Sequence, residues 1–239
     1  MSSKPNDLGL KIAIMGAMPE EIAPILEKLG QYKTTEYAGN KYYEASYKGV
    51  ELVIAYSKIG KVFSTLTATT MIEHFGAEKL LFSGVAGAIS ETLKVGDLIV
   101  ATKLAQHDLD ITAFGHPFGY VPEGAVFVEA DKDMITLSKE VAKEMGKVVQ
   151  EGIIATGDQF VANEKRKNWI GTEFNADALE MEGGSVAVVC NALNIPFFIL
   201  RAISDAADMD ASFSFDEFLE TSAIESAEFV MKMVDKIIE

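Results

Sequence analysis

The chain has 239 residues, which suits one large α/β domain, because a single hydrophobic core serves up to about 250 residues before a chain divides. Hydrophobic residues make up 49% and charged residues 24%, a balance typical of globular proteins and not of disordered ones. The formal net charge of −15 disfavours nucleic-acid binding, since phosphate contacts require clustered Lys and Arg.

Residues 1–9 are expected to be a short polar tail ahead of a single domain over 10–239. They lack the basic start, apolar stretch and small-residue cleavage site of a secretory signal. The longest apolar-rich stretch, at 186–203, is interrupted by polar residues, a proline and Arg201, so it falls short of the roughly 20 apolar residues that span a membrane. The single cysteine, Cys190, excludes an internal disulfide and suits a reducing compartment. We therefore expect a cytoplasmic protein.

Strand and helix patterns alternate along the first half of the chain. In the first helix, Ile22, Ile25 and Leu29 share one face, and Pro19 suits the first helical position. The elements predicted here are a strand at 10–15, a helix from Pro19, a hairpin of strands at 41–47 and 51–56, a helix at 62–75 and a buried strand at 80–82.

The second half continues the alternation. Its predicted elements are strands at 97–104, 148–156 and 196–203, helices at 131–145 and 181–193, and a last helix that opens with a capping box at Ser214. Such alternation predicts a single α/β domain with a central twisted mixed or parallel sheet flanked by helices. Ligands bind beyond the carboxyl ends of strands in such sheets, where four polar or Gly-rich segments fall: 16–21, 83–88, 156–161 and 202–206.

Acidic residues in these segments are the candidates for chemistry. Asp205 follows an apolar strand, and burial there would raise its pKa and make it a candidate acid, although a turn residue fits the same pattern. Glu21 also suits a plain stabiliser of a helix start. Glu180 and Glu182 stand two residues apart on an extended approach to a helix, and we expect one to point inward and the other toward solvent.

Other motifs are weaker. The segment GVAG at 84–87 resembles a phosphate cradle but lacks the rest of either phosphate-binding fingerprint. His107, Asp108 and Asp110 suggest a metal site, yet no second His or Cys cluster accompanies them. We expect neither a metal nor a cofactor, and we expect Cys190 to be a core residue.

Nine short motifs, in order, make the chain similar to the bacterial methylthioadenosine/S-adenosylhomocysteine nucleosidases, within the nucleoside phosphorylase superfamily. The resemblance covers nearly everything after Gly9. The motifs are IMGAM at 14–18, IGKV at 59–62, GVAG at 84–87, VGD at 95–97, DITAFG at 110–115, TGD at 156–158, EME at 180–182, RAISD at 201–205 and SFDEF at 214–218.

The resemblance implies hydrolysis of an N-glycosidic bond and a role for each site residue. Asp205 would protonate N7 of adenine, with Ser204 orienting its carboxyl, and Glu21 would position and deprotonate the attacking water, with Arg201 nearby. The chemistry agrees, because cleavage through an oxocarbenium-like sugar needs an acid at the leaving group and a base beside the water. An ordinary Asp, with a pKa of about 3.9, is protonated in only about one molecule per thousand at pH 7, so Asp205 must be desolvated or hydrogen-bonded in its neutral form.

The resemblance also implies how substrate is bound. Phe160 would stack on the base, backbone groups of Val161 would read its edge, and Glu182 would accept hydrogen bonds from the ribose hydroxyls above Met181. The other residues implied in binding are Met18, Val85, Ala86, Gly87, Glu180, Phe215 and, from the partner subunit of a homodimer, Phe114.

The chain departs from the family pattern at several positions: Pro19, Val85, the pair Gly183-Gly184 and the pair His116-Pro117. These departures bear on substrate preference and leave the chemistry intact. The chain also resembles the branch that cleaves 6-amino-6-deoxyfutalosine. A phosphorolytic enzyme is the nearest alternative, but it needs cationic phosphate ligands, and neither 18–21 nor 84–87 contains Arg or Lys. A non-catalytic nucleoside-binding protein is the other alternative, and it has no need of both Asp205 and Glu21.

Overall fold

The computed structural model describes residues 9–207 and 211–239, apart from the side chains of 211–217. The expected tail at 1–9 lies almost wholly outside the described residues. The strands are β1 (Lys11–Gly16), β2 (Lys33–Tyr37), β3 (Asn40–Tyr47), β4 (Val50–Tyr56), β5 (Lys79–Ala88), β6 (Leu98–Gln106), β7 (Val128–Glu129), β8 (Val149–Thr156), β9 (Ala178–Glu180) and β10 (Phe197–Asp205). The helices are α1 (Pro19–Leu29), α2 (Lys61–Glu73), α3 (Lys132–Glu144), α4 (Glu164–Phe174), α5 (Gly183–Ala192) and α6 (Ala211–Ile238), and η1 (Thr112–Phe114) is a 3₁₀ helix.

The described strands form one mixed sheet in the order β10-β6-β8-β9-β5-β1-β4-β3-β2, with β7 beside β6. Strand β10 pairs parallel with β5 and antiparallel with β6, so β5, β9, β8, β6 and β10 close into a ring. Strands β1, β4, β3 and β2 continue from β5 as an open sheet. The expected α/β class and mixed sheet are confirmed, while the closed ring was not predicted.

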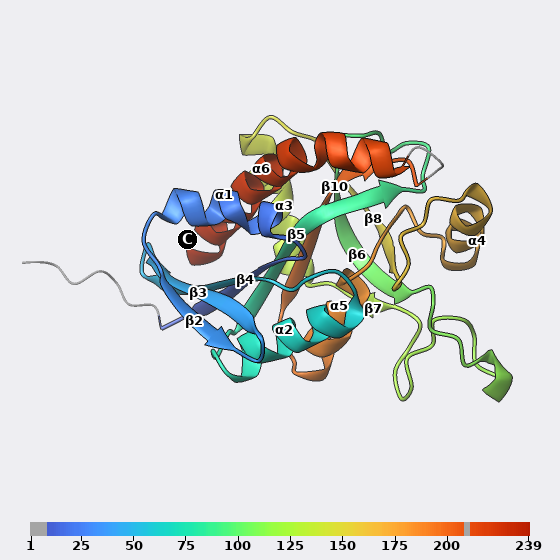
Figure 1. Cartoon of the computed structure of the whole chain (residues 1–239), viewed down its shortest axis with the longest axis horizontal. Helices are drawn as coiled ribbons and strands as arrows, with labels where there is room; N and C mark the ends of the chain where they lie inside the picture. The colour runs from blue at the N-terminus through green and yellow to red at the C-terminus, as the bar shows by residue number, and fades with distance from the viewer. Residues whose placement is uncertain (1–8, 208–210) are drawn as a thin grey trace, which may run out of the picture.

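Helices cover both sides of this sheet (Figure 1). Helix α6 packs against α1, α3, β5 and β10 on one side, and α2 and α5 pack together on the other. Every residue of β10 is buried, as expected of a strand covered on both faces. Among the described residues, no helix is long and apolar enough to cross a membrane.

The predicted hairpin is confirmed: β3 and β4 pair antiparallel, and Lys48 and Gly49 at the turn have φ of 48° and 88°, the positive angles that a tight hairpin requires. Two strands, predicted at 80–82 and 196–203, end later than predicted. Residues 83–88 continue β5, and Asp205 is the last residue of β10, because both strands stay paired to the cavity edge. The last helix begins at Ala211 and not at Ser214, and the side chains of the predicted capping box lie outside the described residues.

Candidate active site

A cavity that is partly open to solvent lies where several strands end, and the empty space in it, open solvent included, is about 540 Å³. It draws residues from the segments that follow β1, β4, β8 and β9 and from the last residues of β5 and β10. Most of the residues expected in the site line it: Met18, Glu21, Val85, Ala86, Gly87, Phe160, Val161, Glu180, Met181, Glu182, Ser204 and Asp205.

Asp205 ends β10 with only 4% of its surface exposed. Ser204 Oγ donates a hydrogen bond to Asp205 Oδ2 at 2.8 Å, and the amide of Ala207 donates to Oδ1, also at 2.8 Å. Burial, one of the two conditions that the sequence argument offered for a protonated Asp205, is therefore present. The carboxylate is held at both oxygens, which fixes its orientation toward the cavity.

Glu21 lies in the first turn of α1 and is 2% exposed. Its Oε2 accepts hydrogen bonds from the amides of Ala17 and Met18, the latter at 3.0 Å, so it does stabilise the helix start. Burial raises the pKa of Glu21 above its usual value, while Arg201 and the backbone amides oppose that rise. The cavity thus contains a carboxylate that takes up a proton more readily than an exposed glutamate.

Both carboxylates of the EME motif are buried, so the expected solvated one is wrong. Glu180 is 5% exposed and Glu182 is 6% exposed. Glu180 ends β9, and Glu182 is the N-cap residue of α5. Side chains two residues apart in an extended segment lie on the same face, which is why the expectation of one solvated carboxylate fails. Both side chains therefore point toward the cavity.

Glu180 forms a buried ion pair with Arg201, Nη2 to Oε2 at 2.7 Å. Thr156 Oγ1 donates to the other oxygen of Glu180, and the amide of Gly183 donates to Oε2 at 2.7 Å. The Arg201 guanidinium also lies 4.1 Å from the centre of the Phe82 ring. Arg201 is 1% exposed and does not line the cavity, so it acts on the site from behind the carboxylates.

Glu182 accepts a hydrogen bond from the amide of Gly60 at 2.9 Å. Burial, together with the neighbouring charge of Glu180, raises the pKa of Glu182 to about 8. Three buried carboxylates, Glu21, Glu180 and Glu182, therefore share the single guanidinium of Arg201. This electron-rich pocket suits a ligand that brings hydrogen-bond donors or positive charge.

The glycine motif at 84–87 has a steric explanation. It lies within β5, and a β-carbon at Gly84 would sit 3.0 Å from Glu21 Oε1 and 3.1 Å from Arg201 Nη1. The absence of a side chain at Gly84 leaves room for that carboxylate and that guanidinium beside the strand. The motif makes room for charged groups, which explains it without a phosphate.

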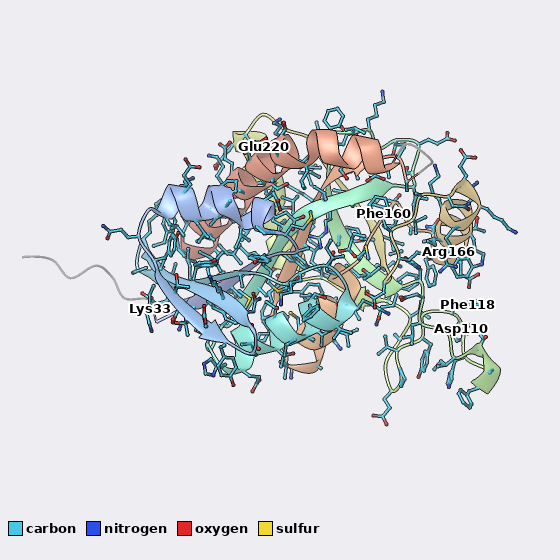
Figure 2. The ribbon with its side chains drawn as sticks, viewed as in Figure 1. Lys33, Asp110, Phe118, Phe160, Arg166 and Glu220 are labelled. Atoms are coloured by element: carbon cyan, nitrogen blue, oxygen red, sulfur yellow. The ribbon has the colours of Figure 1, made fainter. Side chains whose placement is uncertain are left out.

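Besides Arg201, one expected site residue whose side chain is described, Phe114, does not line the cavity of this chain. Phe114 belongs to η1 and is 80% exposed, and the green segment that carries η1 projects away from the body of the molecule (Figure 1). Figure 2 shows Asp110 and Phe118 of the same projecting segment well away from Phe160, which borders the cavity. The side chain of Phe215 lies outside the described residues.

The sequence analysis missed four cavity residues: Ala17, Ile59, Gln159 and Leu179. Each lies within or next to one of the nine motifs, and this position beside a motif is the feature of the sequence that could have identified it as a cavity residue.

His107, considered above for a metal site, is buried, and desolvation together with Arg166 lowers its pKa to about 4. Within residues 9–207 and 211–239, no group of three or more His, Cys, Asp or Glu could hold a metal ion. Cys190 is buried in the core, as expected.

The chain belongs to the phosphorylase superfamily, whose profile matches residues 11–239. It is 59% identical to the aminodeoxyfutalosine nucleosidase of Campylobacter jejuni, over 95% of this chain and 100% of that protein. It is 36% identical to the 5′-methylthioadenosine/S-adenosylhomocysteine nucleosidase of Bacillus subtilis, again over 95% of this chain and 100% of that protein.

Solved structures point to the same family. An aspartate-to-asparagine mutant of the Helicobacter pylori 5′-methylthioadenosine/S-adenosylhomocysteine nucleosidase, with 5′-methylthioadenosine in its active site, has a TM-score of 0.94 at 51% identity, over 96% of this chain and 100% of that chain. The futalosine hydrolase of Helicobacter pylori has a TM-score of 0.93 at 52% identity, over 95% of this chain and 98% of that chain. These relatives confirm the expected nucleoside phosphorylase-like fold and the expected N-glycosyl hydrolase activity.

Proposed function

We propose that the cavity binds an adenine nucleoside and directs water to its anomeric carbon, with 5′-methylthioadenosine, S-adenosylhomocysteine and 6-amino-6-deoxyfutalosine as substrates. One observation carries the proposal: Asp205 and Glu21, each buried and hydrogen-bonded, line the same cavity from different elements, β10 and α1. Glycosidic hydrolysis needs such a pair, one group for the leaving base and one for the water.

Asp205 is the general acid in this mechanism. It gives a proton to N7 of adenine, which leaves as a neutral base instead of an anion. Ser204 and the amide of Ala207 hold the two carboxyl oxygens, and so fix the direction of proton transfer. Phe160, 47% exposed at the cavity rim, stacks on the base, and the backbone of buried Val161 reads its edge.

Glu21 is the general base. Its raised pKa suits proton abstraction from water, because a base works best when its pKa approaches the working pH. Arg201, which is paired with Glu180, opposes the rise in the pKa of Glu21 through its positive charge. Glu182 accepts hydrogen bonds from the ribose hydroxyls, and Met181 packs beneath the sugar. Met18 and the strand residues Val85, Ala86 and Gly87 complete the wall.

The substrate set rests on the named activities of the relatives. The aminodeoxyfutalosine nucleosidases of Campylobacter jejuni and Helicobacter pylori are 59% and 52% identical to this chain, whereas the methylthioadenosine/S-adenosylhomocysteine nucleosidase of Bacillus subtilis is 36% identical. We therefore propose that 6-amino-6-deoxyfutalosine is cleaved alongside the two thioether nucleosides.

The phosphorolytic alternative lacks support at the nucleophile side. The cavity lining within the described residues includes no Lys or Arg, and the Arg201 guanidinium is already paired with Glu180. A phosphate beside Glu21 would meet a like charge, and at about 4 Å that repulsion is about 4 kcal/mol at an effective dielectric near 20.

We also propose that the working unit is a cytoplasmic homodimer. Phe114 is exposed, and a second exposed apolar group stands at the start of α2: Ile59, Val62, Phe63 and Leu66. A self-complementary contact across these surfaces would cover them. In such a dimer Phe114 would line the partner's cavity on the side of the 5′ substituent.

The proposed cytoplasmic location rests on Cys190, which is buried and forms no disulfide, as suits a reducing compartment.

The test is adenine release from each of the three nucleosides, measured with and without phosphate and followed by mass spectrometry of the sugar. We expect free adenine and a free sugar at a rate that does not depend on phosphate. A predominant ribose 1-phosphate product would overturn the hydrolytic mechanism, and failure to release adenine from all three would overturn the substrate assignment.

A further inference from the structure

We propose that Lys61, Asp108 and Asp158 are positioning residues that lock the sugar-side carboxylate Glu182 to the loop that binds the base. They form a ring of hydrogen bonds outside the cavity. The inference rests on the proposed function to the extent that Glu182 and the loop at 159–161 are assigned to sugar and base.

The link to the sugar side passes through Gly60. Its amide donates to Glu182 Oε1 at 2.9 Å, which is the bond from α2 to the cavity. Gly60 is the N-cap residue of α2 and has φ 102°, a conformation that favours glycine. As a glycine it has no side chain with which to cap the helix itself. The position of the Gly60 amide therefore depends on what holds the start of α2.

Asp158 contributes to holding the start of α2. Its Oδ1 accepts the amide of Lys61 at 2.7 Å, so it caps α2 from a separate segment. The same oxygen lies 2.9 Å from where a β-carbon of Gly60 would be, and only glycine fits there. Asp158 directly precedes Gln159, Phe160 and Val161, which line the cavity. One carboxylate thus connects the base loop with the residue that holds Glu182.

Asp108 closes the ring. Its Oδ2 accepts the amide of Asp158 and its Oδ1 accepts from Lys61 Nζ, each at 2.7 Å. Lys61 Nζ also donates to Gln106 Oε1 at 3.2 Å. The side chains of Lys61 and Asp108 are 19% and 24% exposed, so solvent screens this pair only in part. The ring of Lys61, Asp108 and Asp158 therefore fixes the sugar subsite relative to the base subsite. None of its three residues lines the cavity in which the substrate is proposed to bind.

A double-mutant cycle tests the inference. We expect Asp158→Ala to lower kcat/KM by about 10-fold or more, since a small misplacement of a binding group is costly. In a Glu182→Gln background the same change should cost less than about 2-fold, because the group on which the ring acts has already been altered. An equal factor in both backgrounds would show that the ring acts on the fold alone, and would overturn the inference.

The lysine has its own test. Lys61→Met should lower kcat/KM, and Lys61→Arg should recover most of the loss because it restores a cation facing Asp108. Full activity of Lys61→Met would show that the lysine side chain is not needed in the ring.

The matched control for Asp158→Ala is Asp131→Ala. This variant removes a comparable helix cap at the start of α3, a 2.8 Å hydrogen bond from the amide of Met134 to Asp131 Oδ1. It should cost similar stability while kcat/KM stays within about 2-fold.

Hydrogen exchange at the Gly60 amide provides a readout that does not depend on turnover. We expect this amide to exchange about 10-fold faster in Asp158→Ala than in the parent or in Asp131→Ala. Unchanged exchange would overturn the ring. If the parent chain released no adenine, the proposed function would fail, and the exchange experiment would still decide whether Asp158 holds Gly60.

Discussion

Gly87 and Asp205 are in contact across the paired strands β5 and β10: a β-carbon at position 87 would lie 2.8 Å from Asp205 Oδ1. The register of the two strands shifts between Ile203 and Asp205, which brings the acid opposite this glycine. The absence of a side chain at 87 is therefore part of how the carboxylate reaches its place.

Gly87→Ala should displace the Asp205 carboxyl and lower kcat by about 10-fold or more, since catalytic geometry tolerates little movement. Steady-state kinetics with 5′-methylthioadenosine measures the effect. Gly124→Ala is the control, because a β-carbon there would meet only ordinary contacts, 3.4 Å or more away. Normal turnover in Gly87→Ala would show that the contact yields without cost.

Asp205→Asn keeps the shape of the side chain and removes the transferable proton. Turnover should fall by about 100-fold or more, the usual contribution of a general acid. Binding of a neutral inhibitor, measured by calorimetry, should be affected much less. Near-normal turnover would remove Asp205 from the acid role.

The stability of the protein should depend on pH through Glu182. Its folded pKa, about 8, lies above the value of 4.5 for an exposed glutamate, so the folded state holds the proton more tightly. That stabilisation is complete below about pH 4.5 and is lost as the pH rises through about 8, at up to about 1.4 kcal/mol per pH unit.

Glu182→Gln mimics the protonated form and should lose this dependence. Urea unfolding of the two proteins between pH 5 and 9 should therefore show Glu182→Gln gaining stability relative to the parent as the pH increases. Parallel curves would mean that Glu182 is ionised in the folded protein across the whole range.

The proposed dimer predicts a mass of about twice 25.9 kDa by light scattering at assay concentrations. Phe114→Ala should raise KM for nucleosides with an apolar 5′ substituent more than it lowers kcat, because the side chain is proposed to line the partner's cavity without touching the reacting atoms. A fully active monomer would contradict both statements.

Much of the fold was predictable because most strands are apolar and helices such as α1 and α3 are amphipathic. The elements that escaped prediction lack those signals. Strand β2 is mostly exposed, β9 spans only Ala178–Glu180, and the polar helix α4 buries only Ile170 and Phe174. The extension of β5 through 84–87 was hidden by its glycines, which usually indicate a loop but here admit neighbouring charged groups.

The identity of the cavity residues came from motifs, whereas their partners required coordinates. No pattern in the sequence pairs Arg201 with Glu180, or brings the amide of Gly60 to Glu182. These contacts join residues far apart in the chain. The expectation of one solvated carboxylate in the EME motif failed because side chains two residues apart in an extended segment lie on the same face.

The closure of the strand ring by β10 has a consequence for how the protein is made. Strand β10 lies late in the chain, and until residues 197–205 emerge from the ribosome, β5 and β6 each lack a pairing partner. Unpaired edges of buried, apolar strands favour aggregation, so a nascent or truncated chain ending before Phe197 exposes both. The same segment carries Asp205. Closing the ring and acquiring the proposed acid are therefore one event, and a chain truncated before β10 lacks both.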